Sequence, residues 1–237
     1  CSRKQYCIWQ ILQVKVVVIL YGKKMVIGGL KQQLIAITLW FYLSEMNNKI
    51  ITILGGAGSI GGELVRQLCV ENKVILFDQN ESAVNNLTEE LKQEGYDVEG
   101  VIGDIRDKET VHNLFVTYQP SIVINAAALK HVTLSQFFPK EYVMTNILGH
   151  LNVIEECKKC PNFEKCIYIS TDKAVATFKN VMGATKMCSE TIHRSMGEGY
   201  TAVRFGNVLE SRGSLLEIWK RQFKDGQPLT ITDLRMK

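Results

Sequence analysis

Residues 50–61 read IITILGGAGSIG, a short apolar run followed at once by a glycine-rich stretch. The apolar run has the length and β-branched composition of a buried strand, and a helical pattern follows it. Gly55 would permit a tight turn, Gly58 would let a pyrophosphate approach the backbone, and Gly61 would let the helix pack closely on the strand. We therefore expect a dinucleotide-binding loop here, with a plain glycine-rich turn as the alternative.

The expected helix after this loop begins near Ser59 and Ile60, whose N–H groups would face the phosphates. Asp78 ends the next apolar run, about 20 residues later, where a carboxylate accepts hydrogen bonds from ribose hydroxyls and repels a 2′-phosphate. Gln79 and Asn80 bring no cation for such a phosphate. We therefore predict an NAD(P) cofactor, with NAD favoured, and helix capping is the alternative role of Asp78.

Apolar runs and amphipathic stretches alternate along the rest of the chain. The expected strands are 50–54, 73–77, 98–102, 122–125, 166–170 and 201–205; the expected helices are 60–70, 82–94, 108–118, 140–157 and 181–196. This alternation is typical of βαβ units. We predict an α/β fold: a Rossmann-type doubly wound parallel sheet over residues 49–210, then the start of a truncated C-terminal substrate-binding portion over 211–237.

Residues 1–48 allow two interpretations, which stay open. The apolar run at 34–43 has only ten residues, whereas a membrane-spanning helix needs about 20. Its basic flanks are compatible with a membrane-proximal segment. The alternative is a degenerate βα unit with a strand at 14–21 and a helix at 25–37.

The net charge is +4, and residues 1–45 alone carry +5, which leaves a nearly neutral remainder. Such a remainder has no electrostatic footprint for nucleic acid. The hydrophobic content of 46% suffices for a sizeable core. The chain opens on Cys1 instead of Met and stops at Lys237 in mid-pattern, so we expect a piece of a longer protein.

The seven cysteines have scattered spacing and an odd count, which does not indicate a disulfide framework. Reduced thiols of a cytoplasmic protein are the simpler interpretation. Cys157 and Cys160 form a CxxC with Cys166 six residues on. A zinc site would need a fourth ligand. We expect no metal.

Two further turns would complete a cofactor site. Asp104 and Ile105 follow the third expected strand, where Asp104 is well placed to meet an adenine amino group; a turn residue is the alternative. Ala126 and Ala127 follow the fourth expected strand, and their small side chains would leave room for the cofactor. Mere helix–sheet packing is the alternative for the two alanines.

The fifth expected strand leads into Thr171, Asp172 and Lys173, at the sheet edge where ligands bind in open α/β sheets. Short-chain dehydrogenases place a Ser or Thr here, followed by a YxxxK pair. Lys186 matches that lysine, but Met182 stands at the tyrosine position. Because a thioether cannot transfer a proton, either the domain is inactive or another group does the proton work.

Several longer motifs in the same order make a resemblance specific. They are GGAGSIGGEL, NAAALKHV, TNILGHLNV, STDKAV, NVMGATK and RFGNVLESRGS. Over residues 49–235 the chain resembles the nucleotide-sugar 4,6-dehydratases of the CapD-like polysaccharide biosynthesis family, within the extended short-chain dehydrogenase/reductase superfamily. A methionine-containing subgroup of this family tends to be long and membrane-anchored.

The resemblance implies a UDP-N-acetylglucosamine-type substrate and a self-contained redox cycle with bound NAD(P)+. Hydride leaves carbon 4, water is lost across carbons 5 and 6, and hydride returns to carbon 6. Asp172 would protonate the departing hydroxyl, and Lys173 would remove the carbon 5 proton once desolvation or a nearby charge such as Lys186 favours its neutral form. Thr171 would form a hydrogen bond with the 4-hydroxyl. The alternative is a surface Asp–Lys pair.

Other positions follow from the same resemblance. Lys130 and His131 would lie near the substrate or cofactor, although a lone histidine has a structural alternative. Asn146 would support the active-site backbone beside the substrate, with helix capping as its alternative. Arg204 and Asn207 lie toward the nucleotide-sugar pocket, and Asn207 is the expected substrate contact.

The chain also departs from the family pattern. One residue is inserted between Val175 and Asn180, the proline usual there is missing, and the substrate domain is cut short. Two alternatives therefore stay open: a catalytically impaired NAD(P)-binding module, and a nucleotide-sugar epimerase of the same fold, against which Met182 argues. For the parent protein we expect a homo-oligomer in the cytoplasm or at the cytosolic face of the inner membrane.

Overall fold

The computed structural model describes residues 16–20, 23–25, 46–175, 180–206 and 215–230. The chain forms two compact units, residues 1–206 and 207–237, which are described separately. The strands of the first unit are β1 (Val16–Leu20), β2 (Lys23–Met25), β3 (Ile50–Leu54), β4 (Lys73–Asp78), β5 (Val98–Ile102), β6 (Ile122–Asn125), β7 (Lys165–Thr171) and β8 (Tyr200–Phe205). Its helices are α3 (Ser59–Leu68), α4 (Glu81–Gln93), α5 (Lys108–Tyr118), α6 (Val132–Phe137), α7 (Pro139–Tyr142), the π-helix η1 (Val143–Gly149), α8 (His150–Lys159) and α9 (Val181–Ser195).

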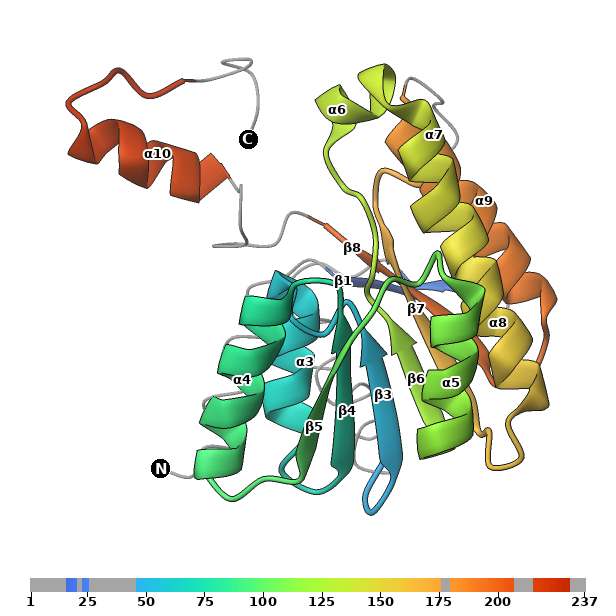
Figure 1. Cartoon of the computed structure of the whole chain (residues 1–237). Helices are drawn as coiled ribbons and strands as arrows, with labels where there is room; N and C mark the ends of the chain where they lie inside the picture. Colours follow the sequence, from blue (N-terminus) through green and yellow to red (C-terminus); the bar gives the residue numbers. More distant parts are fainter. Residues whose placement is uncertain (1–15, 21–22, 26–45, 176–179, 207–214, 231–237) are drawn as a thin grey trace. The chain divides into compact units, whose positions relative to one another are not determined.

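The strands form a single sheet with the order β2-β1-β8-β7-β6-β3-β4-β5. Strands β3 to β8 are parallel to one another, and β1 pairs antiparallel with both β8 and β2. The chain winds from β3 through β4 to β5 and then returns to the other side of β3 (Figure 1). This reversal between β3 and β6 is the topological switch point of a Rossmann-type sheet. The predicted doubly wound parallel sheet is confirmed.

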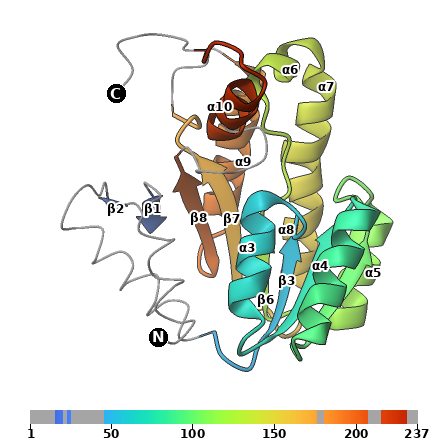
Figure 2. The same ribbon diagram turned by 90° about the vertical axis from the view of Figure 1, so that its left-hand side faces the viewer.

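Helices cover both faces of the sheet, as Figures 1 and 2 show from two sides. Val65 of α3 and Leu87 of α4 join one core cluster with Ile53. Leu114 of α5 and Val153 of α8 join a second cluster on the opposite face. Because β3 is buried on both faces, its side chains are apolar at nearly every position, which explains the continuous run in the sequence.

Side chains at three helix starts fix the turns that lead out of strands. Asn80 accepts a hydrogen bond from the Ala83 N–H at 3.1 Å and so caps α4. Asp107 caps α5, and Asn180 caps α9 by accepting from the Gly183 N–H at 2.7 Å. These caps satisfy N–H groups that have no partner within the helix.

The predicted helix at 140–157 is wrong in its details. The structure has α7, then the π-helix η1, then α8, without an interruption of the helical path. A π-helix widens the turn and frees backbone groups for other partners. Here the Asn146 carbonyl accepts a hydrogen bond from the Ser189 hydroxyl at 2.6 Å. The short helix α6 had no counterpart in the predicted elements.

The N-terminal strand β1 falls within the stretch 14–21, for which one interpretation of the sequence predicts a strand. Met25, the expected first residue of the following helix, belongs to β2 instead. The remainder of that expected helix lies outside the described residues. Within the described part of the chain, every helix is too short or too polar to cross a bilayer.

The second unit contributes helix α10 (Leu215–Lys224) to the described residues. The Trp219 indole N–H donates a hydrogen bond to the Thr230 carbonyl at 2.8 Å, which ties the end of this segment back to the helix. No helix was predicted in this stretch.

Two adjacent glycines of α3 give a sharp test of the packing at the switch point. A Cβ atom at Gly61 would lie 2.1 Å from the Gly55 carbonyl oxygen, whereas one at Gly62 would meet its nearest atom, in Leu87, at 3.5 Å. We expect Gly61→Ala to lower the free energy of unfolding by about 2 kcal/mol or more. The matched change Gly62→Ala should be neutral or stabilising by up to about 1 kcal/mol. Urea denaturation measures both, and equal effects would contradict this account of the loop.

Candidate active site at the switch point

The glycine loop lies where the strand order reverses. Gly55 has a φ of +74°, a left-handed conformation that favours glycine. Its N–H donates to the Phe77 carbonyl at 2.9 Å, and a Cβ there would lie 2.6 Å from the Ala127 backbone nitrogen. Gly58, at the N-cap of α3, offers no side chain to cap the helix. The loop therefore leaves backbone exposed at the start of a helix, which is the arrangement that receives a phosphate.

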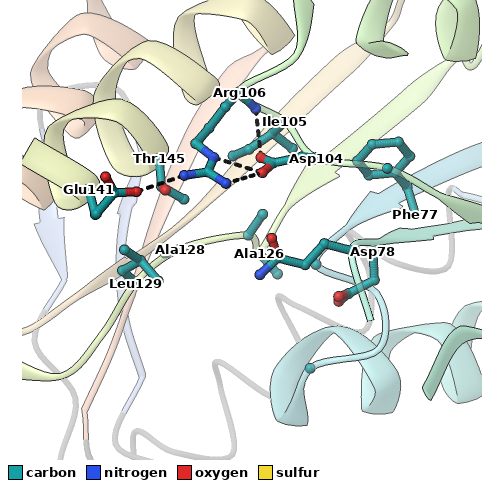
Figure 3. Close-up of a pocket in the computed structure, with 15 residues that line it drawn as sticks. Phe77, Asp78, Asp104, Ile105, Arg106, Ala126, Ala128, Leu129, Glu141 and Thr145 are labelled. Atoms are coloured by element: carbon teal, nitrogen blue, oxygen red, sulfur yellow. Dashed lines mark hydrogen bonds and ion pairs between the residues drawn. The ribbon is translucent and has the colours of Figure 1, made fainter. Parts of the chain in front are cut away.

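A cavity of about 430 Å³ opens beside this loop (Figure 3). Its walls come from the loops that follow β3, β4, β5 and β6, together with α7 and η1. The lining residues are Gly55, Gly58, Phe77, Asp78, Gln79, Gly103, Asp104, Ile105, Arg106, Ala126, Ala127, Ala128, Leu129, Glu141 and Thr145. Seven of the predicted cofactor residues belong to this set. Ser59 and Ile60 are the first residues of α3, and Gly61 packs against the loop itself.

Asp78 ends β4 and lines the cavity. One carboxylate oxygen accepts from the Ala57 N–H at 3.1 Å, and the other from the Asn80 N–H at 3.0 Å. Because Asn80 caps α4, the capping alternative for Asp78 does not describe this helix. The carboxylate is instead fixed against the glycine loop, with lone pairs left for a ligand.

Asp104 shares the cavity with Arg106, a residue that the sequence analysis did not select. The Arg106 Nε donates to Asp104 Oδ2 at 2.7 Å, and its Nη1 donates to Glu141 Oε2 at 2.8 Å. Arg106 stands two residues after Asp104 in the same turn, a signal that could have been used. Its other partner, Glu141, lies 35 residues further along the chain, and no sequence motif connects the two.

The second candidate group lies at the carboxyl end of β7. The Lys173 Nζ is 3.4 Å from Asp172 Oδ1, and the Thr171 hydroxyl donates to that same oxygen at 3.1 Å. The Asp172 and Lys173 side chains are 49% and 45% exposed. The described residues therefore do not supply the desolvation expected for a neutral lysine.

The backbone of this turn is held from several sides. The Asp172 N–H donates to the Phe205 carbonyl at 2.9 Å, and Arg204 donates to the Ala174 carbonyl at 3.3 Å. A Cβ atom at Gly183 would lie 2.8 Å from the Lys173 carbonyl oxygen, so α9 approaches the turn closely. The stretch 176–179, which contains the one residue inserted relative to the family pattern, lies outside the described residues.

Arg204, the residue before the end of β8, has its guanidinium engaged by partners within the protein. It forms a two-pronged ion pair with Glu190 of α9, with distances of 2.8 and 2.7 Å. The Ser170 hydroxyl also donates to Glu190, at 2.7 Å. The Glu190 side chain is 3% exposed, so its charge needs these partners.

Lys186 lies below this edge, in the interior. Its Nζ donates to the Ile169 carbonyl at 2.5 Å and stands 4.1 Å from the centre of the Tyr168 ring. Burial lowers the pKa of Lys186 to about 7, against an opposing effect of the Glu190 carboxylate. Lys186 is therefore only partly charged at neutral pH, which weakens its expected role as a fixed positive charge. Met182, at the tyrosine position, is also buried.

Two histidines extend this buried layer. The His150 ring stacks on Tyr168 with a 4.2 Å centroid separation, and its Nδ1 lies 2.8 Å from the Asn125 amide nitrogen. Burial lowers the pKa of His193 to about 4 and that of His150 well below its ordinary value. Both rings are therefore neutral structural groups at physiological pH.

The expected substrate residues fall in different places. Asn146 is buried; it accepts from the Leu129 N–H at 2.8 Å and donates to the Thr185 hydroxyl at 3.0 Å. It therefore supports the backbone at Leu129, as predicted, and its predicted contact with the substrate stays a prediction. Lys130 and His131 are exposed next to the cavity wall. Asn207 lies outside the described residues.

No group of three His, Cys, Asp or Glu side chains gathers as a metal site in the described part of the chain. Cys157 and Cys166 are buried in the core, and Cys160 donates to the Pro120 carbonyl at 3.4 Å. These thiols act as packing groups of a helix end and a strand start.

The fold and the switch-point cavity define a Rossmann-type protein of the short-chain dehydrogenase/reductase kind. Residues 51–237 match the family described as polysaccharide biosynthesis protein, and the chain belongs to that family. The resemblance inferred from the sequence motifs is confirmed.

Two relatives illustrate the match. The chain is 40% identical over 202 residues to the capsular polysaccharide biosynthesis protein CapD of Staphylococcus aureus, covering 81% of this chain and 33% of that protein. It is 36% identical over 210 residues to a UDP-N-acetylglucosamine 4,6-dehydratase (inverting) of Campylobacter jejuni, covering 80% and 58%. The chain thus spans between a third and three fifths of the length of these relatives.

Solved structures show the same architecture. Pen from Bacillus thuringiensis superposes with a TM-score of 0.73 at 33% identity, over 81% of this chain and 60% of that one. A UDP-glucose 4-epimerase from Bifidobacterium longum, in complex with NAD+ and UDP, gives a TM-score of 0.56 at 25% identity, over 62% and 48%.

The pKa of Lys186 predicts a pH dependence of stability. An unfolded lysine holds its proton up to about pH 10.4, whereas folded Lys186 loses it near pH 7. Between these values the unfolded chain binds more protons, so stability rises with pH, by about 1 kcal/mol per pH unit at most. We expect Lys186→Met to flatten this rise between pH 7 and 9 in urea denaturation. The exposed control Lys158→Met should keep it, and an unchanged slope in Lys186→Met would contradict the assignment.

Proposed function

We propose that the parent protein is a nucleotide-sugar 4,6-dehydratase of polysaccharide biosynthesis, acting on a UDP-N-acetylglucosamine-type substrate with NAD as cofactor. The observation that carries this proposal is the Asp172–Lys173 pair after β7, the strand that pairs with β6, combined with a methionine at the tyrosine position. An acid and an amine at one sheet edge are the two groups that a water elimination needs. The named activity of the Campylobacter relative supports the same reading.

The cavity residues fit a dinucleotide. The left-handed Gly55 and the uncapped start of α3 suit a pyrophosphate, and the fixed Asp78 carboxylate suits ribose hydroxyls. Among the lining residues Arg106 is the single cation, and two carboxylates already engage it. A 2′-phosphate would therefore meet net negative charge, which favours NAD over NADP.

When bound, a nicotinamide dinucleotide supplies the site that accepts hydride from carbon 4 and returns it to carbon 6. The protein's own residues manage the protons. In this proposal Thr171 hydrogen-bonds the 4-hydroxyl, Asp172 protonates the departing 6-hydroxyl, and Lys173 takes the carbon 5 proton.

The contact between Asp172 and Lys173 suggests how both become active together. Transfer of one proton from the Lys173 ammonium to the Asp172 carboxylate produces the acid and the base at once. In the structure both side chains are about half exposed to water. A sugar covering the pair would remove water and penalise the two charges, which shifts the pair toward its neutral form. Substrate binding would thus switch on the proton chemistry.

An epimerase of the same fold is the second candidate, supported by the named activity of the Bifidobacterium structure. Buried Met182 argues against it, because a thioether cannot exchange a proton with the 4-hydroxyl. A catalytically impaired NAD(P)-binding module is the third. A cytoplasmic or inner-membrane-face location and a homo-oligomeric state of the parent stay predictions.

Cofactor choice can be measured on the chain itself. We expect NAD+ to bind at least about 10-fold more tightly than NADP+, because Asp78 bonds a ribose hydroxyl and repels a phosphate. Asp78→Ala should weaken NAD+ binding about 10-fold and reduce this discrimination. The exposed control Asp97→Ala should leave both affinities unchanged. Isothermal titration calorimetry measures both affinities for each of the three proteins, and a preference of the unaltered chain for NADP+ would overturn the cofactor assignment.

The reaction can be tested on the full-length parent. Supplied with UDP-N-acetylglucosamine, it should form a product lighter by one water in mass spectrometry, without consuming added NADH. Asp172→Asn and Lys173→Ala should each lower the rate by at least about 100-fold, since each removes a proton-transfer group.

Lys158→Ala provides the control, because Lys158 is exposed in the last turn of α8, at the end of the helix that leads into the start of β7. Its rate should stay normal. Unchanged rates in the Asp172 and Lys173 variants would remove their assigned roles. A product of unchanged mass would favour the epimerase, and tight NAD+ binding with no product would favour the impaired module.

A further inference from the structure

Arg106 lies at the cavity wall between two carboxylates from separate parts of the chain (Figure 3). Its Nε and Nη2 reach Asp104 Oδ2 at 2.7 and 2.5 Å, and its Nη1 reaches Glu141 Oε2 at 2.8 Å. Its own backbone N–H donates to Asp104 Oδ1 at 2.9 Å. One residue therefore engages both carboxylate oxygens of Asp104 and links them to α7.

These contacts are poorly placed to stabilise the fold. The side chains of Asp104, Arg106 and Glu141 are 28%, 38% and 47% exposed, and ion pairs at such exposure contribute little because water and salt screen them. The planar guanidinium instead supplies direction, since its fork fixes the partners' orientation. All three residues line the cavity, so the orientation is imposed on a ligand-facing group.

A fixed Asp104 carboxylate has a definite chemical preference. An ionised carboxylate only accepts hydrogen bonds and has about four lone-pair sites. Arg106 occupies two on Oδ2 and one on Oδ1, which leaves acceptor capacity on Oδ1. A base that presents an N–H donor would be accepted there, and a base that presents a carbonyl oxygen would be rejected.

We propose that Arg106 is a positioning residue for adenine recognition: it holds Asp104 as an oriented acceptor for the exocyclic amino group, while Glu141 steadies the outer side of the guanidinium. This inference rests on the proposed binding of NAD in the same cavity. The new element is that adenine selectivity depends on Arg106. Glu141 of α7, the helix that leads into η1, holds the Arg106 guanidinium in place.

The test compares NAD+ with nicotinamide hypoxanthine dinucleotide, in which a carbonyl oxygen replaces the adenine amino group, by titration calorimetry on the whole chain. The unaltered chain should prefer NAD+ by roughly 10-fold. Arg106→Met should reduce this preference to less than about 3-fold, mainly by weakening NAD+. Asp104→Asn should reverse the preference, because an amide N–H can donate to the carbonyl oxygen.

Arg66→Met is the matched control. Arg66 forms a similar two-pronged, exposed pair with Glu90 on the outer surface of α3 and α4. The Arg66→Met variant should keep the full preference for NAD+ over nicotinamide hypoxanthine dinucleotide. If Arg106→Met also keeps it, or weakens both dinucleotides equally, Arg106 does not position Asp104. If the unaltered chain binds neither dinucleotide, the proposed NAD-dependent function itself fails.

Discussion

Backbone contact at the switch point is the constraint on which the rest of the structure depends. The loop after β3, the first turn of α3 and the loop after β6 approach so closely that Gly55 and Gly61 have no room for a Cβ atom. This contact sets the distance between α3 and the sheet. It also opens the space beyond the strand ends, so that Asp78 and Asp104 face one cavity. A side chain at Gly55 or Gly61 would displace the walls of this cavity as well as the core.

Local patterns in the sequence were enough for the sheet and for the cofactor loop. Strands β3, β4, β6 and β7 are short apolar runs that are buried almost throughout, most of the described helices bury a periodic apolar face, and the glycine spacing carries its own steric meaning. Features that depend on distant partners were not predictable in this way. The pairs Arg106–Glu141 and Arg204–Glu190 join residues from different elements. The inward direction of Lys186 depends on the Ile169 carbonyl, which no motif encodes.

The ionisable groups near the sheet edge form two layers with different physics. Glu190, Lys186 and His193 are buried, so burial and fixed partners set their charge, and they act as a rigid support. Asp172 and Lys173 lie above them in water, where a ligand can change their surroundings. The exposed Asp172–Lys173 pair therefore rests on a buried layer that is held in place by fixed partners.

The pairing of β7 with β8 has a consequence for the order in which the molecule is assembled. The residues that line the nucleotide cavity end at Thr145, but the backbone of Asp172 is held by Phe205, in a strand made later. Since chains fold from the N-terminus during synthesis, a ribosome-bound intermediate would acquire its nucleotide half first. The turn that carries Asp172 and Lys173 would form only after β8 has emerged.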